Sequence, residues 1–336
     1  MAVYNHASRI THHASRITPE ILPSSGRIQE IDALRGFAIF LVILHHSVIK
    51  FPVNIFDIPS CYAVVRFCTS VHMPLFFVIA GFCWSCGDYV SYIRNKFNRL
   101  MIPYIVFNMI DMIPRQLLAQ FVNRPRPIAE SLVKILLYGG EFWFLYTLFV
   151  IFLIYPAIFR LAKFSRSRML IIGGLLFLLA VYGLNAPALE IGSAAHYMFF
   201  FHAGVCIRYI TGGRMPDVKF PAFMLTVMLA LWLALLFGTV KLEIITAIIG
   251  IIACFIMAKS GIFRRIFSRF SEYSLQLYLM NGIMLGISRT IICNILHVSS
   301  PAVIIAFNML IDLLASYMLI KYIFRRSKIM RAIMGM

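Results

Sequence analysis

The sequence predicts an all-α integral membrane protein with about ten transmembrane helices and with both termini in the cytoplasm. Only 13% of its 336 residues are charged and 61% are hydrophobic, whereas soluble domains carry about 25% charged residues. Apolar runs of roughly twenty residues, the length that crosses a bilayer, recur along the chain. Most of the 31 Lys and Arg residues lie in alternate loops between these runs, as the positive-inside rule expects of cytoplasmic loops.

The predicted spans follow one another closely. They cover roughly residues 31–49, 69–87, 100–120, 142–160, 169–185, 194–210, 220–239, 242–258, 272–293 and 301–320. The predicted external loop 121–141 departs from the charge pattern, because it holds Arg124, Arg126 and Lys134. These side chains would meet either an anionic acceptor, such as an acidic glycan, or lipid headgroups.

The chain divides into three predicted segments. Residues 1–27 form a disordered cytoplasmic tail, residues 28–324 the membrane domain, and residues 325–336 a basic cytoplasmic C-terminal tail. The first tail repeats H-A-S-R-I-T, but no Cys or carboxylate precedes Glu20, which disfavours a metal site there. The net charge of +18 is spread over short loops, and this leaves no basic domain to bind nucleic acid.

The first span carries four polar residues that lipid does not tolerate without a partner or a cavity. They are Asp32, Arg35, His45 and His46, and burying a charge costs about 2.5–3.5 kcal/mol even on the lenient insertion scale. In a helix, the eleven residues from Arg35 to His46 make about 1100° of rotation, so both share one face about 16 Å apart. Asp32 is one turn before Arg35 and can pair with it, whereas His45 lies about 80° around the helix.

Two interpretations of these residues remain open. Arg35 and Asp32 form either a structural pair near the headgroups or one end of a functional polar track, and His46 is either a packed core histidine or the other end. His72 begins the second span on the same outer side and is expected to approach His46. Gly81 marks a place where two helix backbones approach closely.

Further candidates lie at the ends of later spans. Arg94, Lys96 and Arg99 would bind phosphates on the cytoplasmic side or only fix the topology. On the outer side, Trp143 is either an interfacial anchor or an aromatic platform for a sugar, and Glu141 stands beside it. Asn281 and Asp312 are expected to form hydrogen bonds between helices. The C-x-x-C of Cys83 and Cys86 stands alone, so we predict no metal site.

Several stretches resemble, in order, acyltransferase family 3, whose membrane proteins O-acylate surface polysaccharides and other exported sugars. The most specific is I-D-A-L-R-G-F-A-I-F-L-V-I-L-H-H at 31–46. The others are M-P-L-F-F-V-I-A-G-F, K-F-N-R-L-M-I-P-Y, F-W-F-L-Y-T-L-F, F-F-F-H-A-G and S-E-Y-S-L-Q-L-Y-L-M-N. The sequence departs from the family at Ala80, where a Ser is usual, and at Asn281, where a His is usual. The second departure weakens any role carried over to the ninth span.

The resemblance implies that Arg35 and His46 are the residues essential for acyl transfer. It also implies acetyl-CoA as the donor substrate, with no bound cofactor, and a hydroxyl of a surface glycan or of its lipid-linked precursor as the acceptor. The expected setting is the bacterial inner membrane, as for O-antigen O-acetyltransferases. A transporter or flippase that passes a lipid-linked glycan along the same track is the alternative function.

Overall fold

The computed structural model describes residues 28–117, 127–162, 165–237 and 242–336, which form helices and contain no β-strand. The predicted tail 1–27 and the predicted acceptor residues Arg124 and Arg126 lie outside the described residues. Each of the ten apolar runs falls on a helix.

The helices of the first half are α2 (Gln29–Ser47), α3 (Pro59–Phe82), α4 (Tyr89–Lys96), the π-helical turn η1 (Phe97–Met101), α5 (Ile102–Leu117), α6 (Ile128–Leu137) and α7 (Trp143–Ala162). Those of the second half are α8 (Arg166–Tyr182), η3 (Ala188–Glu190), α9 (Ile191–Thr211), α10 (Pro221–Phe237), α11 (Glu243–Met257), α12 (Gly261–Ser271), α13 (Ser274–Arg289), η4 (Thr290–Ile295), α14 (Pro301–Leu319), η5 (Ile320–Phe324) and α15 (Lys328–Ile333). Four short helices, α4, α6, α12 and α15, were not expected from the apolar runs, because each mixes charged and apolar residues.

Length and composition alone identify fewer membrane-spanning helices than the ten that we predicted. Among the described residues, four pass both criteria: α3, α7, α13 with η4, and α14 with η5. The pair α11 and α12 would make a fifth, although it bends by 106°. The charges of Glu30, Asp32 and Arg35 keep α2 out of this group. The described part of the chain is therefore all-helical, with four helices, or five counting the bent pair, that are long and apolar enough to cross a membrane.

The ends of two predicted spans differ from the sequence pattern. Helix α3 begins ten residues before the predicted run, at Pro59, because proline is well suited to the first helical position. Helix α5 continues α4 through the π-helical turn η1. Asp88 caps the start of α4 by accepting a hydrogen bond from the backbone N–H of Ser91 at 2.9 Å.

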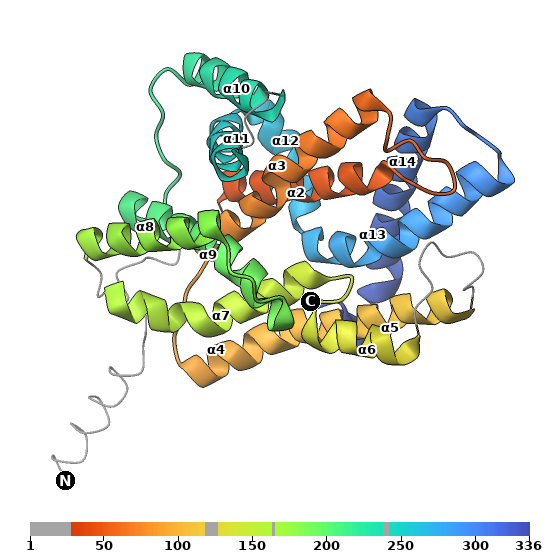
Figure 1. Ribbon diagram of the computed structural model, residues 1–336, viewed down its shortest axis with the longest axis horizontal. Helices are drawn as coiled ribbons and strands as arrows, with labels where there is room; N and C mark the ends of the chain where they lie inside the picture. The colour runs from red at the N-terminus through yellow and green to blue at the C-terminus, as the bar shows by residue number, and fades with distance from the viewer. Residues whose placement is uncertain (1–27, 118–126, 163–164, 238–241) are drawn as a thin grey trace, which may run out of the picture.

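Helices α2 and α3 lie in the centre of the molecule (Figure 1), with α12 packed on α2 and α9 packed on α3. Glycines allow both contacts. A Cβ atom on Gly36 would overlap the backbone carbonyl of Phe267 in α12, and one on Gly81 would overlap that of Phe201 in α9. The expected close approach at Gly81 is thus confirmed, and Gly204 of α9 faces Val78 in the same way.

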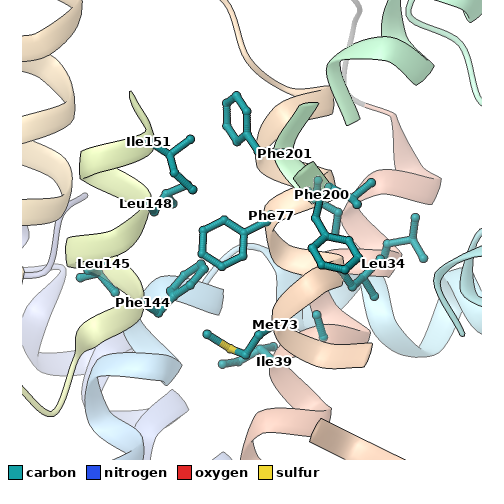
Figure 2. Close-up of a cluster of buried hydrophobic side chains, with 14 of the residues drawn as sticks. Leu34, Ile39, Met73, Phe77, Phe144, Leu145, Leu148, Ile151, Phe200 and Phe201 are labelled. Carbon is teal, nitrogen blue, oxygen red and sulfur yellow. The ribbon is translucent and has the colours of Figure 1, made fainter. Parts of the chain in front are cut away.

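An apolar cluster joins these central helices to α7. Figure 2 shows Phe77 of α3 directed toward Phe144 of α7, whose rings meet edge to face with centroids 5.1 Å apart. Leu34 from α2 and Phe200 and Phe201 from α9 complete the cluster. Because lipid tails are as apolar as these side chains, close packing rather than water exclusion holds such helices together.

The C-terminal segment packs against the helical body. The side-chain amide of Gln276 in α13 donates a hydrogen bond to the backbone carbonyl of Met334 at 2.9 Å, and Met334 is buried. Gly335 adopts a φ of 67° and lies against the carbonyl of Arg99.

We expect Gly81→Ala to destabilise the protein, because the added methyl group must push α9 away from α3. Overpacking of this kind costs about 1–3 kcal/mol, which should appear as a lower melting temperature of the detergent-solubilised protein. Gly174→Ala in α8 is the matched control, since a Cβ atom there meets nothing within 4 Å. Equal melting temperatures for the two variants would contradict the close approach of α3 and α9.

Candidate functional site

The guanidinium of Arg35 is held by groups from three elements. Its Nη1 lies 3.6 Å from Oδ1 of Asp32 and donates to Oγ of Ser271 at 3.5 Å. Its Nη2 donates to the Cys83 sulfur at 3.7 Å. The Ser271 hydroxyl in turn donates to Asp32 at 3.1 Å. The predicted pair of Asp32 and Arg35 is confirmed, and both partners are engaged by a third residue.

Sequence reasoning missed Ser271. It is the last residue of α12 and is buried, and it reaches Asp32 only because α12 folds back along α2. A serine at the end of an amphipathic helix carries no local signal of such a contact.

Three imidazoles meet near the other end of α2. The His45 ring stacks on His46 with centroids 4.7 Å apart and lies 5.5 Å from the ring of His72. His45, expected only as a neighbour of the track, therefore lies between the other two. Within the described part of the chain, its Nδ1 is buried and has no hydrogen-bond partner.

The three histidines differ in what they offer to a substrate. Nδ1 of His72 lies 2.5 Å from the Cys68 carbonyl oxygen, so that nitrogen carries the proton and donates it. The His72 side chain is buried. His46 is exposed, and it is the member of the group that an approaching molecule can reach.

A hydrogen-bonded chain fixes the end of α2 that carries His46. The side-chain amide of Asn308 in α14 donates to the backbone carbonyl of Ser47 at 3.2 Å. The Ser288 hydroxyl in α13 donates to Oδ1 of Asn308. Both side chains are buried. Carbonyls in the last turn of a helix lack intrahelical partners, and Asn308 satisfies one of them next to His46.

A second network joins α13 to α14 away from these residues. Asn281 donates to Oδ2 of Asp312 at 2.5 Å, and Ser316 donates to its Oδ1 at 3.0 Å. The expected interhelical hydrogen bonding of Asn281 and Asp312 is confirmed. Asn281, which stands where the family usually has a His, is thus a structural residue here.

The predicted residues Glu141 and Trp143 lie together at the start of α7. Glu141 forms an ion pair with Lys134 of α6 at 2.7 Å, and its backbone N–H donates to Oδ1 of Asn108 at 3.0 Å. The Trp143 ring lies 5.7 Å from that of Tyr197, at 31°. The start of α7 therefore presents a carboxylate and two aromatic rings tilted by 31°.

Glu190 adds a carboxylate to this region that sequence reasoning missed. It has a left-handed φ of 54° and follows Leu189 at 58°, a conformation that costs about 1–3 kcal/mol per residue outside glycine. Thr147 donates to its Oε2 at 3.4 Å. Gly139 has a φ of 69°, and a Cβ atom there would crowd both Glu190 and Trp143. Nothing local in the sequence marks such a turn.

The basic turn between α4 and α5 contains the predicted phosphate-binding residues. Nζ of Lys96 lies 4.2 Å above the ring of Phe152 in α7, a cation–π contact. Burial, and then the charge of Arg99, lowers the pKa of Lys96 to about 8. The side chains of Arg94 and Arg99 are exposed. The turn η1 carries Arg99, and π-helical turns are frequent at functional sites.

Arg208, in the last turn of α9, is a buried cation. Its Nη1 donates to the carbonyls of Phe82 at 3.2 Å and Trp84 at 3.3 Å, which caps the end of α3. Its Nε has no hydrogen-bond partner among the described residues.

The described residues bring no three His, Cys, Asp or Glu side chains into a geometry that holds a metal ion.

Helix α2 thus carries a fixed arginine near one end and an exposed histidine near the other. The family model for the acyltransferase domain matches residues 28–321. The chain therefore belongs to acyltransferase family 3 and is a membrane acyltransferase in the general sense. Neither the curated proteins nor the solved structures gave a match to this chain.

We expect Asn308→Ala to slow acyl transfer by releasing the end of α2 that carries His46. Losing a buried hydrogen bond costs about 1–3 kcal/mol, so the variant should also melt earlier. Ser316→Ala removes a buried hydroxyl from the same helix and is the control, with a similar loss of stability and an unchanged rate. Steady-state kinetics separate the two, since Asn308→Ala should lower kcat more than it raises KM. Equal rates in both variants would show that Asn308 only stabilises the fold.

Proposed function

We propose that this protein transfers an acetyl group from cytoplasmic acetyl-CoA to a hydroxyl of a surface glycan or of its lipid-linked precursor. The observation that carries the proposal is the arrangement of α2, with the guanidinium of Arg35 fixed at one end and the exposed imidazole of His46 near the other. Family membership supports the acyl-transfer class; the donor and the acceptor are our proposal.

In the proposed reaction, an imidazole nitrogen of His46 accepts the proton of the acceptor hydroxyl while its oxygen attacks the thioester carbonyl. The carbon–sulfur bond breaks, the acetyl ester forms, and the CoA thiolate leaves and takes up a proton. A general base of this kind is worth about 100- to 10,000-fold in rate. Transient acetylation of His46 itself is the alternative chemistry. His45 would support either course, because its ring stacks on that of His46 and also lies 5.5 Å from that of His72.

The donor and acceptor residues are proposed at opposite ends of the bundle. Arg94, Lys96 and Arg99 would meet phosphates on the cytoplasmic side, because charge-assisted hydrogen bonds to phosphate are strong. Trp143 with Glu141 would hold the sugar, since an aromatic ring and a carboxylate match the apolar face and the hydroxyls of a pyranose. Arg124 and Arg126 would add a preference for acidic glycans.

The proposed setting is the bacterial inner membrane, with ten spans and both termini in the cytoplasm. Each of the ten apolar runs falls mainly on a helix, and most Lys and Arg residues alternate between loops as such a topology requires. Helices such as α8 and α10, with 17 residues each, are near the lower limit for a span.

We expect His46→Ala to abolish acetyl transfer by protein reconstituted with radiolabelled acetyl-CoA and a glycan acceptor, while the variant still folds. His297→Asn is the control: His297 is exposed and has a left-handed φ of 52°, which asparagine tolerates. Label transferred at the normal rate by His46→Ala would refute the role of His46. Label that stays on the donor with wild-type protein would favour a glycan transporter.

Donor affinity should fall as the pH rises through about 8, because Lys96 then loses its charge. Lys96→Arg should keep its affinity above that pH, since arginine stays protonated. The measurement is CoA binding at pH 7 and at pH 9.5 for both proteins. A wild-type affinity that does not change with pH would exclude Lys96 from the donor site.

A further inference from the structure

A cavity of about 450 Å³ lies between the first turns of α2 and helix α12. It is partly open, and its lining residues are Gln29, Asp32, Gly261, Arg264, Arg265 and Ser268. Its volume is within the usual range of small-molecule sites, about 300–1,000 Å³. The basic residues that we predicted from the sequence to bind the donor, Arg94, Lys96 and Arg99, do not line this cavity.

Some of the charged side chains that line this cavity have ion-pair partners in the described structure, and one does not. Nη1 of Arg264 pairs with Glu30 at 2.7 Å, which holds its guanidinium in place. Asp32 is already engaged by Arg35 and Ser271. Arg265 is exposed, and within the described ranges it forms no hydrogen bond or ion pair. The cavity thus offers one anchored and one free guanidinium, and its only lining carboxylate is already paired.

The cavity is tied rigidly to the helix that carries the site. Gly36 lets the backbone of α12 touch α2 at Phe267. The ring of Phe37 lies 5.0 Å from Phe267 and 5.2 Å from Phe263. The backbone of α12 that carries Arg264 and Arg265 is therefore fixed relative to Asp32 and, one turn later, Arg35.

We propose that this cavity binds phosphate at the nucleotide end of the acyl donor, in addition to the phosphate contacts proposed for Arg94, Lys96 and Arg99; the proposal rests on the proposed use of acetyl-CoA. Two guanidiniums match phosphate oxygens in bidentate geometry. Gln29 and Ser268 supply neutral donors. The first turn of α12 adds free backbone N–H groups, because the side chain of Ser260 does not cap it.

The position of the cavity suits a donor that lies along α2. A nucleotide held beside Asp32 leaves the pantetheine arm free to pass Arg35 toward His46, about 16 Å further along the helix axis. The thioester then approaches the imidazole from the side opposite the acceptor.

Phosphate esters also occur in anionic lipid headgroups, and α12 exposes Ile262 and Ile266, as a helix at a membrane surface does. The test must therefore separate a nucleotide from a lipid. The probes are adenosine 3′,5′-bisphosphate, which is the phosphorylated end of the donor, and short-chain phosphatidylglycerol. Both are titrated against the full-length protein in neutral detergent.

Arg265→Gln should weaken binding of adenosine 3′,5′-bisphosphate about tenfold, which corresponds to about 1.4 kcal/mol. The variant should fold normally, because its side chain makes no internal contact of this kind. Arg269→Gln is the matched control, one turn further on the same helix, exposed and outside the cavity; its affinity should equal that of the wild type.

Unchanged affinity in Arg265→Gln would overturn the proposal, and so would a loss confined to phosphatidylglycerol, which would mark a lipid site. Acetyl transfer distinguishes this failure from that of the proposed function. If the wild type transfers acetyl groups and Arg265→Gln binds the bisphosphate equally well, only the cavity is misassigned. If the wild type neither binds the bisphosphate nor transfers acetyl groups, the function itself is wrong.

Discussion

A buried carboxylate inside an apolar helix is the constraint on which this structure depends. Asp32 is 8% exposed, and an unpaired charge at such a place is strongly unfavourable. Nη1 of Arg35 and the Ser271 hydroxyl both contact Oδ1 of Asp32. The contact from Ser271 requires α12 to lie along α2. The 106° bend between α11 and α12 and the absence of a side chain at Gly36 make this approach sterically allowed.

The opposite end of α2 depends on a different pair of helices. There the Asn308 amide, fixed by Ser288, holds the last turn through a backbone carbonyl. The apolar cluster shared with α3, α7 and α9 keeps the middle of the helix in place. Since apolar contact with lipid and with protein differ little in free energy, these few polar contacts and the close backbone approaches select one arrangement among many.

Local chemistry decides what the sequence can reveal about such a site. Arg35 and His46 were predictable because each interrupts an apolar run, and Gly81 because it stands within one. Ser271 and Asn308 were not, because their partners lie 236 to 261 positions away in the chain, and a serine or an asparagine in a helix has no fixed role. The cavity beside α12 was hidden for the same reason, since its walls come from two helices far apart in sequence.

Glu190 and Arg208 show two other limits of the sequence. The backbone turn that presents Glu190 is strained, and strain depends on the surrounding structure rather than on residue type. Arg208 lies near the end of an apolar run, where an arginine normally marks a cytoplasmic end, and only the fold shows that it donates to the carbonyls that end α3. The sequence does not fix the number of spans either, because α8 and α10 are too short for their composition to show whether they cross the membrane.

Helix α2 is anchored at both ends, so the distance between Arg35 and His46 is constant. It is set by the rise of the helix, about 1.5 Å per residue. In the proposed reaction, the pantetheine arm of the donor must therefore be long enough to carry the acyl group from Arg35 to His46. A thioester with the same nucleotide and a shortened arm would then bind to the protein as well as the full donor does, but its acyl group would not be transferred.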